Sequence, residues 1–322
     1  MKRNLILSLV LVLVLSLGVA AVAAPKSVMV TDVGGLGDQS FNDAAWRGLN
    51  RAKEELGVDI AVVESSMMTD YEPNLSNLAE SGADLIWAVG FLMTDAVENV
   101  ASLYPNTKFG LIDAVVDEPN VLSFTFKDHE ASYLAGVFAA MWTETGKIGF
   151  IGGMDVPVIE RFESGFRAGV KATKPDAEIL IGYAGNFNDP GKGKELALTQ
   201  YNQGADIIYH AAGATGLGLI EAAKETGKWA IGVDSDQTVL DPEHVVASML
   251  KRVDNAVFYG VEALVNDEFV ATHLELGLAE GGVGLAYSKG IEIPESILTA
   301  VEAANEDIVS GKIEVPGTRA EL

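Results

Sequence analysis

The chain contains no cysteine among its 322 residues. Disulfide bonds, thiolate metal sites and thiol catalysis are therefore excluded. A lipid anchor attached to an N-terminal cysteine is excluded for the same reason, so we expect a protein that is not a lipoprotein. The lack of cysteine neither supports nor opposes export from the cell.

Positive charge is also scarce. Lys and Arg number 22 against 46 Asp and Glu, and the formal net charge is -24. This balance argues against nucleic acid or an anionic membrane as a partner. The four histidines, at positions 129, 210, 244 and 273, stand outside any catalytic-looking motif, and no metal-ligand cluster is apparent. We therefore expect no cofactor, no metal site and no catalytic residue.

Long apolar runs are confined to the beginning of the chain. Lys2 and Arg3 precede an apolar stretch from Leu5 to about Val19, and the small-residue run AAVAAP follows. This pattern is typical of a secretory signal peptide, here residues 1–23. An uncleaved membrane anchor is the alternative. The sequence thus predicts a periplasmic or secreted protein released by cleavage after Ala23.

From Lys26 onward, short β-like apolar runs alternate with helical patterns, as in parallel βαβ construction. The rhythm restarts after residue 146, and the length exceeds that of one typical domain. We predict an α/β fold of two doubly wound parallel-sheet lobes, joined by a hinge of several strands. The expected bounds are 24–126 plus about 253–288 for the first lobe, and 127–252 plus about 289–322 for the second. Residues 273–288 are predicted to form a strand pair around a glycine turn.

The stretch DVGGLGDQSFND, residues 32–43, follows the first predicted strand. Its glycines resemble part of a phosphate-binding loop, but Asp38 would repel a phosphate. We expect Ser40 to cap the following helix, with Asp43 completing an approximate capping box. Phe41 and Asn42 would then face the edge of the sheet where ligands gather in open α/β folds. A core position for Phe41 and a solvated one for Asn42 remain alternatives.

The second predicted lobe contains a similar place. Phe187 follows a strand, and Asp189 with Pro190 is a typical helix start. Two aromatic rings at facing strand ends can hold a flat ligand between them, and stacking on a base contributes about 1 to 3 kcal/mol per ring.

Polar side chains arrive at the same strand ends. Asp32, Asp113 and Asp234 each end a predicted strand, and a carboxylate accepts hydrogen bonds from donors such as ribose hydroxyls or purine N–H groups. Lys251 ends another strand and can donate a hydrogen bond to an acceptor or neutralise a carboxylate. Gly213 permits close backbone approach. Helix caps or turns for the aspartates, an exposed lysine and a plain glycine turn remain alternatives.

Three segments together carry a family resemblance: DVGGLGDQSFNDAAWRG, IGGMDVPVIERFESGFRAGV and AGNFNDPGKGKELA. They resemble the basic membrane protein family of ABC-transporter substrate-binding proteins, which includes purine-nucleoside receptors. The resemblance covers about residues 26–316. It implies a type I periplasmic-binding fold that closes on a nucleoside and works with ABC permease and ATPase subunits.

The resemblance also implies roles for particular residues. Aromatic side chains that match Phe41 and Phe187 hold the base. The polar contacts correspond to Asp32, Asn42, Asp113, Gly213, Asp234 and Lys251. Asp234 and Lys251 are expected near the ribose. Many family members are lipoproteins, and this chain departs from them, which implies a freely soluble form.

Composition and motifs leave three functions to compare. The first is a monomeric nucleoside-binding protein of an importer, with another small ligand such as a sugar as its variant. The second is a nucleoside or glycoside hydrolase that uses paired carboxylates; the spread of the acids over separate strands disfavours it. The third is a ligand sensor built on the same fold.

Overall fold

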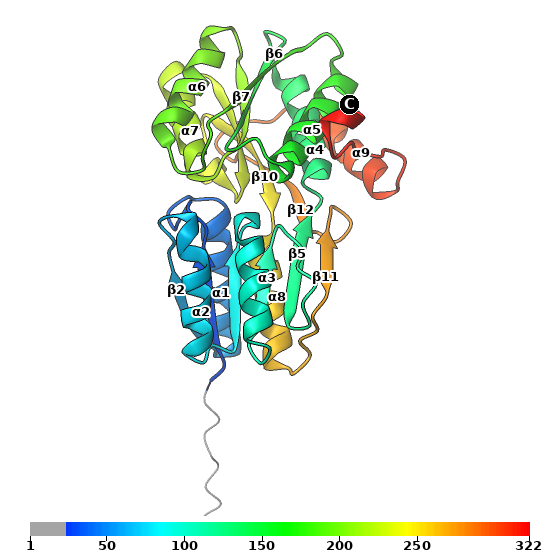
Figure 1. The fold of residues 1–322 in the computed structure, drawn as a ribbon. Coiled ribbons are helices and arrows are strands. Elements are labelled where there is room, and N and C mark those ends of the chain that lie inside the picture. The colour runs from blue at the N-terminus through cyan, green and yellow to red at the C-terminus, as the bar shows by residue number, and fades with distance from the viewer. Residues whose placement is uncertain (1–23) are drawn as a thin grey trace, which may run out of the picture.

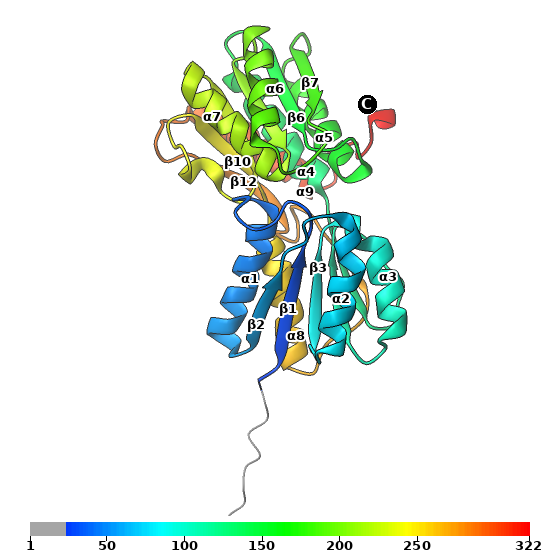
Figure 2. The same ribbon diagram turned by 60° about the vertical axis from the view of Figure 1, so that its left-hand side comes forward.

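The computed structural model describes residues 24–322. The predicted signal peptide lies outside the described residues and stays a prediction. The described chain forms two α/β lobes, which Figures 1 and 2 show one above the other. Each lobe holds a six-stranded, mostly parallel sheet flanked by helices, which confirms the predicted fold class. In residues 24–322, no helix has the length and apolar character needed to cross a membrane.

The sheet of the first lobe is parallel throughout, in the order β11-β5-β4-β3-β1-β2. Its central strands are nearly continuous apolar runs because helices cover both faces. Helices α1 and α8 pack together on one face, and α2 and α3 on the other. The elements are β1 (Lys26–Thr31), α1 (Phe41–Leu56), β2 (Asp59–Val63), α2 (Tyr71–Glu80), β3 (Leu85–Val89), α3 (Thr94–Leu103), β4 (Lys108–Ile112), β5 (Val121–Phe126), α8 (Val253–Val265) and β11 (His273–Leu276).

The sheet of the second lobe has the order β12-β10-β9-β8-β6-β7, and β12 is antiparallel to β10. Helix α4 packs against both α5 and α9, whereas α6 packs against α7. The elements are α4 (Asp128–Trp142), β6 (Lys147–Gly152), α5 (Pro157–Thr173), β7 (Glu178–Tyr183), α6 (Pro190–Asn202), β8 (Ile207–Ala211), α7 (Leu217–Thr226), β9 (Trp229–Asp234), β10 (Val245–Lys251), β12 (Val283–Tyr287) and α9 (Glu295–Val309). Short 3-10 helices are η1 (Met68–Asp70), η2 (Phe91–Met93), η3 (Gly213–Gly216), η4 (Gln237–Val239) and η5 (Arg319–Glu321).

The chain passes between the lobes three times: from β5 to α4, from β10 to α8, and from β11 to β12. Strands β11 and β12 form where a strand pair was predicted, but they do not pair with each other, because each joins a different sheet. Sheet membership therefore moves the last proposed lobe boundary from about 288 to between Leu276 and Val283. The bounds by residue number otherwise remain a proposal.

Helices α4 and α5 lie unusually close because glycines face the neighbouring backbone. A Cβ on Gly136 would lie 2.3 Å from the carbonyl oxygen of Phe166, and one on Gly169 would lie 2.1 Å from that of Tyr133. Only glycine allows this approach without a shift of the helices. The contact places the first turns of α5 firmly beside the ends of the strands.

Candidate functional site

A cavity lies between the lobes, where the carboxyl ends of the strands of both sheets meet. About 540 Å³ there is free of protein atoms, and this volume includes open solvent. All eight predicted site residues line it: Asp32, Phe41, Asn42, Asp113, Phe187, Gly213, Asp234 and Lys251. The ends of the strands thus bring these residues together, and their role in binding stays a proposal.

The aromatic residues come from both lobes. Phe41 is the first residue of α1, and Phe187 lies in the loop between β7 and α6; both rings are half-buried. A Cβ on Gly153 would lie 2.2 Å from Cδ1 of Phe187, so this glycine makes room for the ring. The capping prediction beside it is confirmed, because the Asp189 side chain accepts a hydrogen bond from the Lys192 amide at the start of α6.

Sequence reasoning missed two further phenylalanines of the cavity, Phe91 and Phe162. Phe91 directly follows Gly90 at the end of β3, so the strand-end criterion could have found it. Phe162 is on the second turn of α5 and reaches the cavity only because α5 packs closely on α4. No local pattern in the sequence indicates that contact.

Asp32 and Asn42 form one polar unit. Asp32 Oδ1 accepts hydrogen bonds from Asn42 Nδ2 and from the Gly34 amide, both at 2.8 Å. Burial raises the pKa of Asp32 to about 6, although these two bonds oppose the rise. The Asn42 amide nitrogen also donates to Asp38 at 3.2 Å. Since carboxylates only accept, the nitrogen must face them, and Asn42 Oδ1 is left buried without a hydrogen-bond partner in the described chain.

The start of α1 is capped differently from the prediction. Ser40 occupies the N-cap position, but its side chain caps no amide. Asp38 performs that role: its carboxylate accepts from the amides of Ser40, Asn42 and Asp43 at 2.8 to 3.1 Å. The Asp43 carboxylate accepts instead from the amides of Gly37 and Gln39 within the preceding loop. The predicted capping box is therefore wrong, and the Ser40 hydroxyl is free to donate across the cleft to Asp234.

Lys251 is buried rather than exposed, with 1% of its side chain accessible. Its Nζ lies 2.7 Å from Asp113 and 3.2 Å from Asp128. Burial alone would lower the pKa of Lys251, but the neighbouring carboxylates raise it above its usual value. Burial raises the pKa of Asp128 to about 6, against the attraction of Lys251. Asp128, which follows β5 at the start of α4, was not among the predicted residues, although it too follows a strand end.

The ring of Phe162 lies beside this ion pair, with its centroid 5.3 Å from Lys251 Nζ, and the Phe41 ring lies at the same distance. Such placement of a cation near ring faces is favourable. The cation is thus held by carboxylates and rings contributed by both lobes.

Asp113 and Asp234 occupy matching places in the two lobes. Asp113 directly follows β4 and Asp234 ends β9, and both have a positive φ, 71° and 62° respectively, which is uncommon for residues other than glycine. Such backbone conformations persist where the surroundings impose them, often at binding sites. Burial raises the pKa of Asp234 to about 7, while Lys251 and the Ser40 hydrogen bond oppose the rise.

The arrangement favours an uncharged, flat ligand rich in hydrogen-bond donors. The cavity offers rings from both lobes and acceptor oxygens on Asp32, Asn42 and Asp234. In residues 24–322, no group of three or more acidic or histidine side chains is placed to hold a metal ion.

Comparisons with known proteins identify the family of the chain. A family model described as "ABC transporter substrate-binding protein PnrA-like" matches residues 25–319. A Listeria monocytogenes protein named "CD4+ T-cell-stimulating antigen" is 40% identical over 311 residues, covering 89% of this chain and 87% of the relative. The "ABC transporter nucleoside-binding protein BmpA" of Lactococcus lactis is 38% identical over 314 residues, covering 90% and 89%.

Among solved structures, a solute-binding protein of an ABC transporter system from Aeropyrum pernix is similar to this chain. It superposes with a TM-score of 0.85 at 33% identity, covering 92% of this chain and 94% of the other. These matches confirm the resemblance that the motifs indicated.

Proposed function

Since the chain belongs to the family of PnrA-like ABC transporter substrate-binding proteins, we propose that it binds a purine nucleoside between its lobes and delivers it to an importer. Its partners are then the permease and ATPase subunits of that importer. It acts outside the cytoplasm as a freely soluble monomer, without cofactor and without catalysis.

The observation that carries the proposal is a single cavity with phenyl rings from both lobes and buried acceptors beside them. Phe41 and Phe187 are available to stack on the base. Asp32 and Asn42 Oδ1 suit a base edge that presents N–H donors. Asp234 suits ribose hydroxyls. The name of the relative BmpA, a nucleoside-binding protein, supports the same ligand class.

The purine nucleosides differ in the hydrogen-bond donors that they present to these acceptors. Guanine presents a ring N–H and an amino group on one edge, and hypoxanthine presents the ring N–H, whereas adenine has no ring N–H donor there. We expect guanosine and inosine to bind more tightly than adenosine, and free ribose to bind weakly. Isothermal titration calorimetry with this panel tests the proposal. Clear binding of a free sugar, together with no heat from any nucleoside, would overturn it.

Replacement of one ring tests the stacking. Phe187→Ala is expected to weaken guanosine binding by about 5- to 150-fold, because a base stacked on an aromatic ring gains about 1 to 3 kcal/mol. Tyr259→Ala is the matched control: Tyr259 is on α8, half exposed and outside the cavity. Equal affinities of the Phe187 variant and the wild type would remove the ring from the proposed site.

A further inference from the structure

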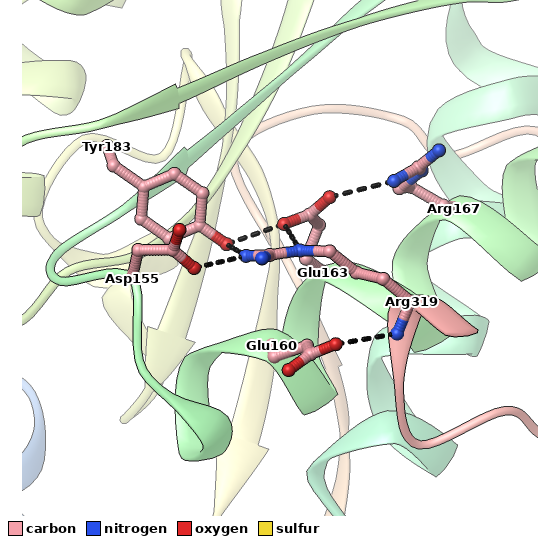
Figure 3. A network of polar contacts seen from close by, with 6 residues as sticks. All are labelled: Asp155, Glu160, Glu163, Arg167, Tyr183 and Arg319. Atoms are coloured by element: carbon pink, nitrogen blue, oxygen red, sulfur yellow. Dashed lines mark hydrogen bonds and ion pairs between the residues drawn. The ribbon is translucent and has the colours of Figure 1, made fainter. Parts of the chain in front are cut away.

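One residue near the end of the sequence contacts α5, a helix that contributes to the wall of the cavity. Arg319 begins η5 and lies against α5, as Figure 3 shows. Its backbone amide donates to Glu160 at 2.8 Å, and its Nε donates to Glu163 at 2.9 Å. Its Nη2 donates to Asp155 at 2.5 Å and to the Tyr183 hydroxyl at 2.6 Å. Arg319 thus joins the β6–α5 loop, the first turns of α5 and the end of β7.

The centre of this network is a buried carboxylate. Glu163 has 3% of its side chain exposed and accepts hydrogen bonds from Arg319, Arg167 and Tyr183. A buried charge is costly unless its partners are in place, and removing one partner leaves part of that cost uncompensated. Arg319 therefore connects α5 to the end of β7 through this buried carboxylate.

The same turns of α5 also carry cavity residues. Val158, Ile159 and Phe162 line the cavity, and they lie in the same two turns as Glu160 and Glu163. Phe162 in turn contacts Lys251, with 5.3 Å between its ring centroid and Nζ. A shift of α5 of a few tenths of an ångström would therefore be transmitted to the ring and to the buried cation.

We propose that Arg319 is a positioning residue for the ligand site, acting through α5 and Phe162 on the shape of the cavity. Its side chain is not part of the cavity lining. The proposal has two parts. The affinity part, an effect of Arg319 on ligand binding, rests on the proposed function. The mechanical part, an effect of Arg319 on the position of α5, concerns the ligand-free protein alone.

The mechanical part is tested by amide hydrogen exchange on the ligand-free protein. In Arg319→Ala, residues 156–166 are expected to exchange at least about tenfold faster, while α6 on the other face of the sheet is unchanged, because opening is local. Lys312→Ala is the matched control, since Lys312 forms an exposed ion pair with Asp307 away from α5. Unchanged exchange in 156–166 would overturn the proposal, whether or not a nucleoside binds.

The affinity part is tested by a double-mutant cycle with guanosine as the probe. Arg319→Ala is expected to weaken binding about 3- to 30-fold and to be non-additive with Phe162→Ala, yet additive with Phe41→Ala in the other lobe. Additivity with both phenylalanines would overturn the route through Phe162. Tyr183→Phe, a milder change that keeps the ring, is expected to give a smaller effect in the same direction and serves if the arginine variant fails to fold. A wild type that binds no nucleoside would contradict the proposed function, while the exchange experiment would still decide the mechanical part.

Discussion

In the proposed nucleoside complex, Asp32 and Asp234 are the residues whose protonation the ligand would change. Burial raises the pKa of Asp32 to about 6 and that of Asp234 to about 7 in the free protein. A ligand that donates hydrogen bonds to a carboxylate favours its charged form and so lowers its pKa. Near neutral pH, ligand binding should therefore release protons.

The sign of the pH dependence follows from this release. Affinity is expected to be constant above pH about 7 and to fall as the pH drops below it, by at most about tenfold per pH unit for each proton. Calorimetry in buffers of different ionisation enthalpy measures the protons released. Asp234→Asn, which the positive φ at this position tolerates, should reduce that number. Proton uptake on binding, or an affinity that rises toward acid pH, would contradict the roles given to these carboxylates.

At the scale of elements, the start of α1 shows how a helix terminus shapes the site. Asp38 holds the first amides of α1 and so orients Asn42 toward Asp32. Ser40 is thereby left to connect α1 with the second lobe. Asp38 therefore caps the helix, whereas Ser40, two residues later, makes the contact with the second lobe.

This separation predicts different consequences for the two side chains. Asp38→Ala is expected to lower the free energy of unfolding by about 1 to 3 kcal/mol, because several buried amides lose a charged acceptor. Ser40→Ala is expected to cost less stability. Urea denaturation of both variants measures the difference. A larger loss of unfolding free energy in the serine variant would contradict the assignment of Asp38 as the cap.

Much of the fold could be predicted because apolar runs and helix starts are local. The alternation of short apolar strands with helices that the sequence predicts from Lys26 onward is present in both lobes. Strand ends also identified most of the polar site, since open α/β sheets bring them to one edge. The contributions of Phe162 and Arg319 depend on how α5 packs, and the pairing of β11 and β12 depends on which lobe each joins. Helix α9 was also not predicted.

At the scale of the whole molecule, the lobes are held together by hydrogen bonds beside the cavity. Ser235 Oγ donates to the carbonyl oxygen of Ser40 at 2.9 Å and accepts from Arg47 Nη2 at 2.8 Å. Gln237 Nε2 donates to the carbonyl oxygen of Gln39 at 3.2 Å. These bonds join the start of α1 to the loop after β9, next to Asp234. They connect the two lobes directly.

Loss of these contacts should shorten the life of the complex. Ser235→Ala removes two cross-lobe bonds and is expected to raise the dissociation rate of guanosine by about 3- to 30-fold, with a smaller change in association. Stopped-flow tryptophan fluorescence measures both rates. Ser310→Ala, which changes an exposed serine after α9, is the control. An unchanged dissociation rate would show that closure does not depend on this contact.

The three passages of the chain between the sheets also constrain how such a receptor can diversify. Neither lobe is one uninterrupted stretch of sequence. A single genetic crossover therefore cannot exchange one intact lobe for that of a relative. Substitutions within the existing cavity wall change specificity without any such exchange. The most accessible of these lie on the loops after the strands, where a changed side chain alters the ligand surface without disturbing either core.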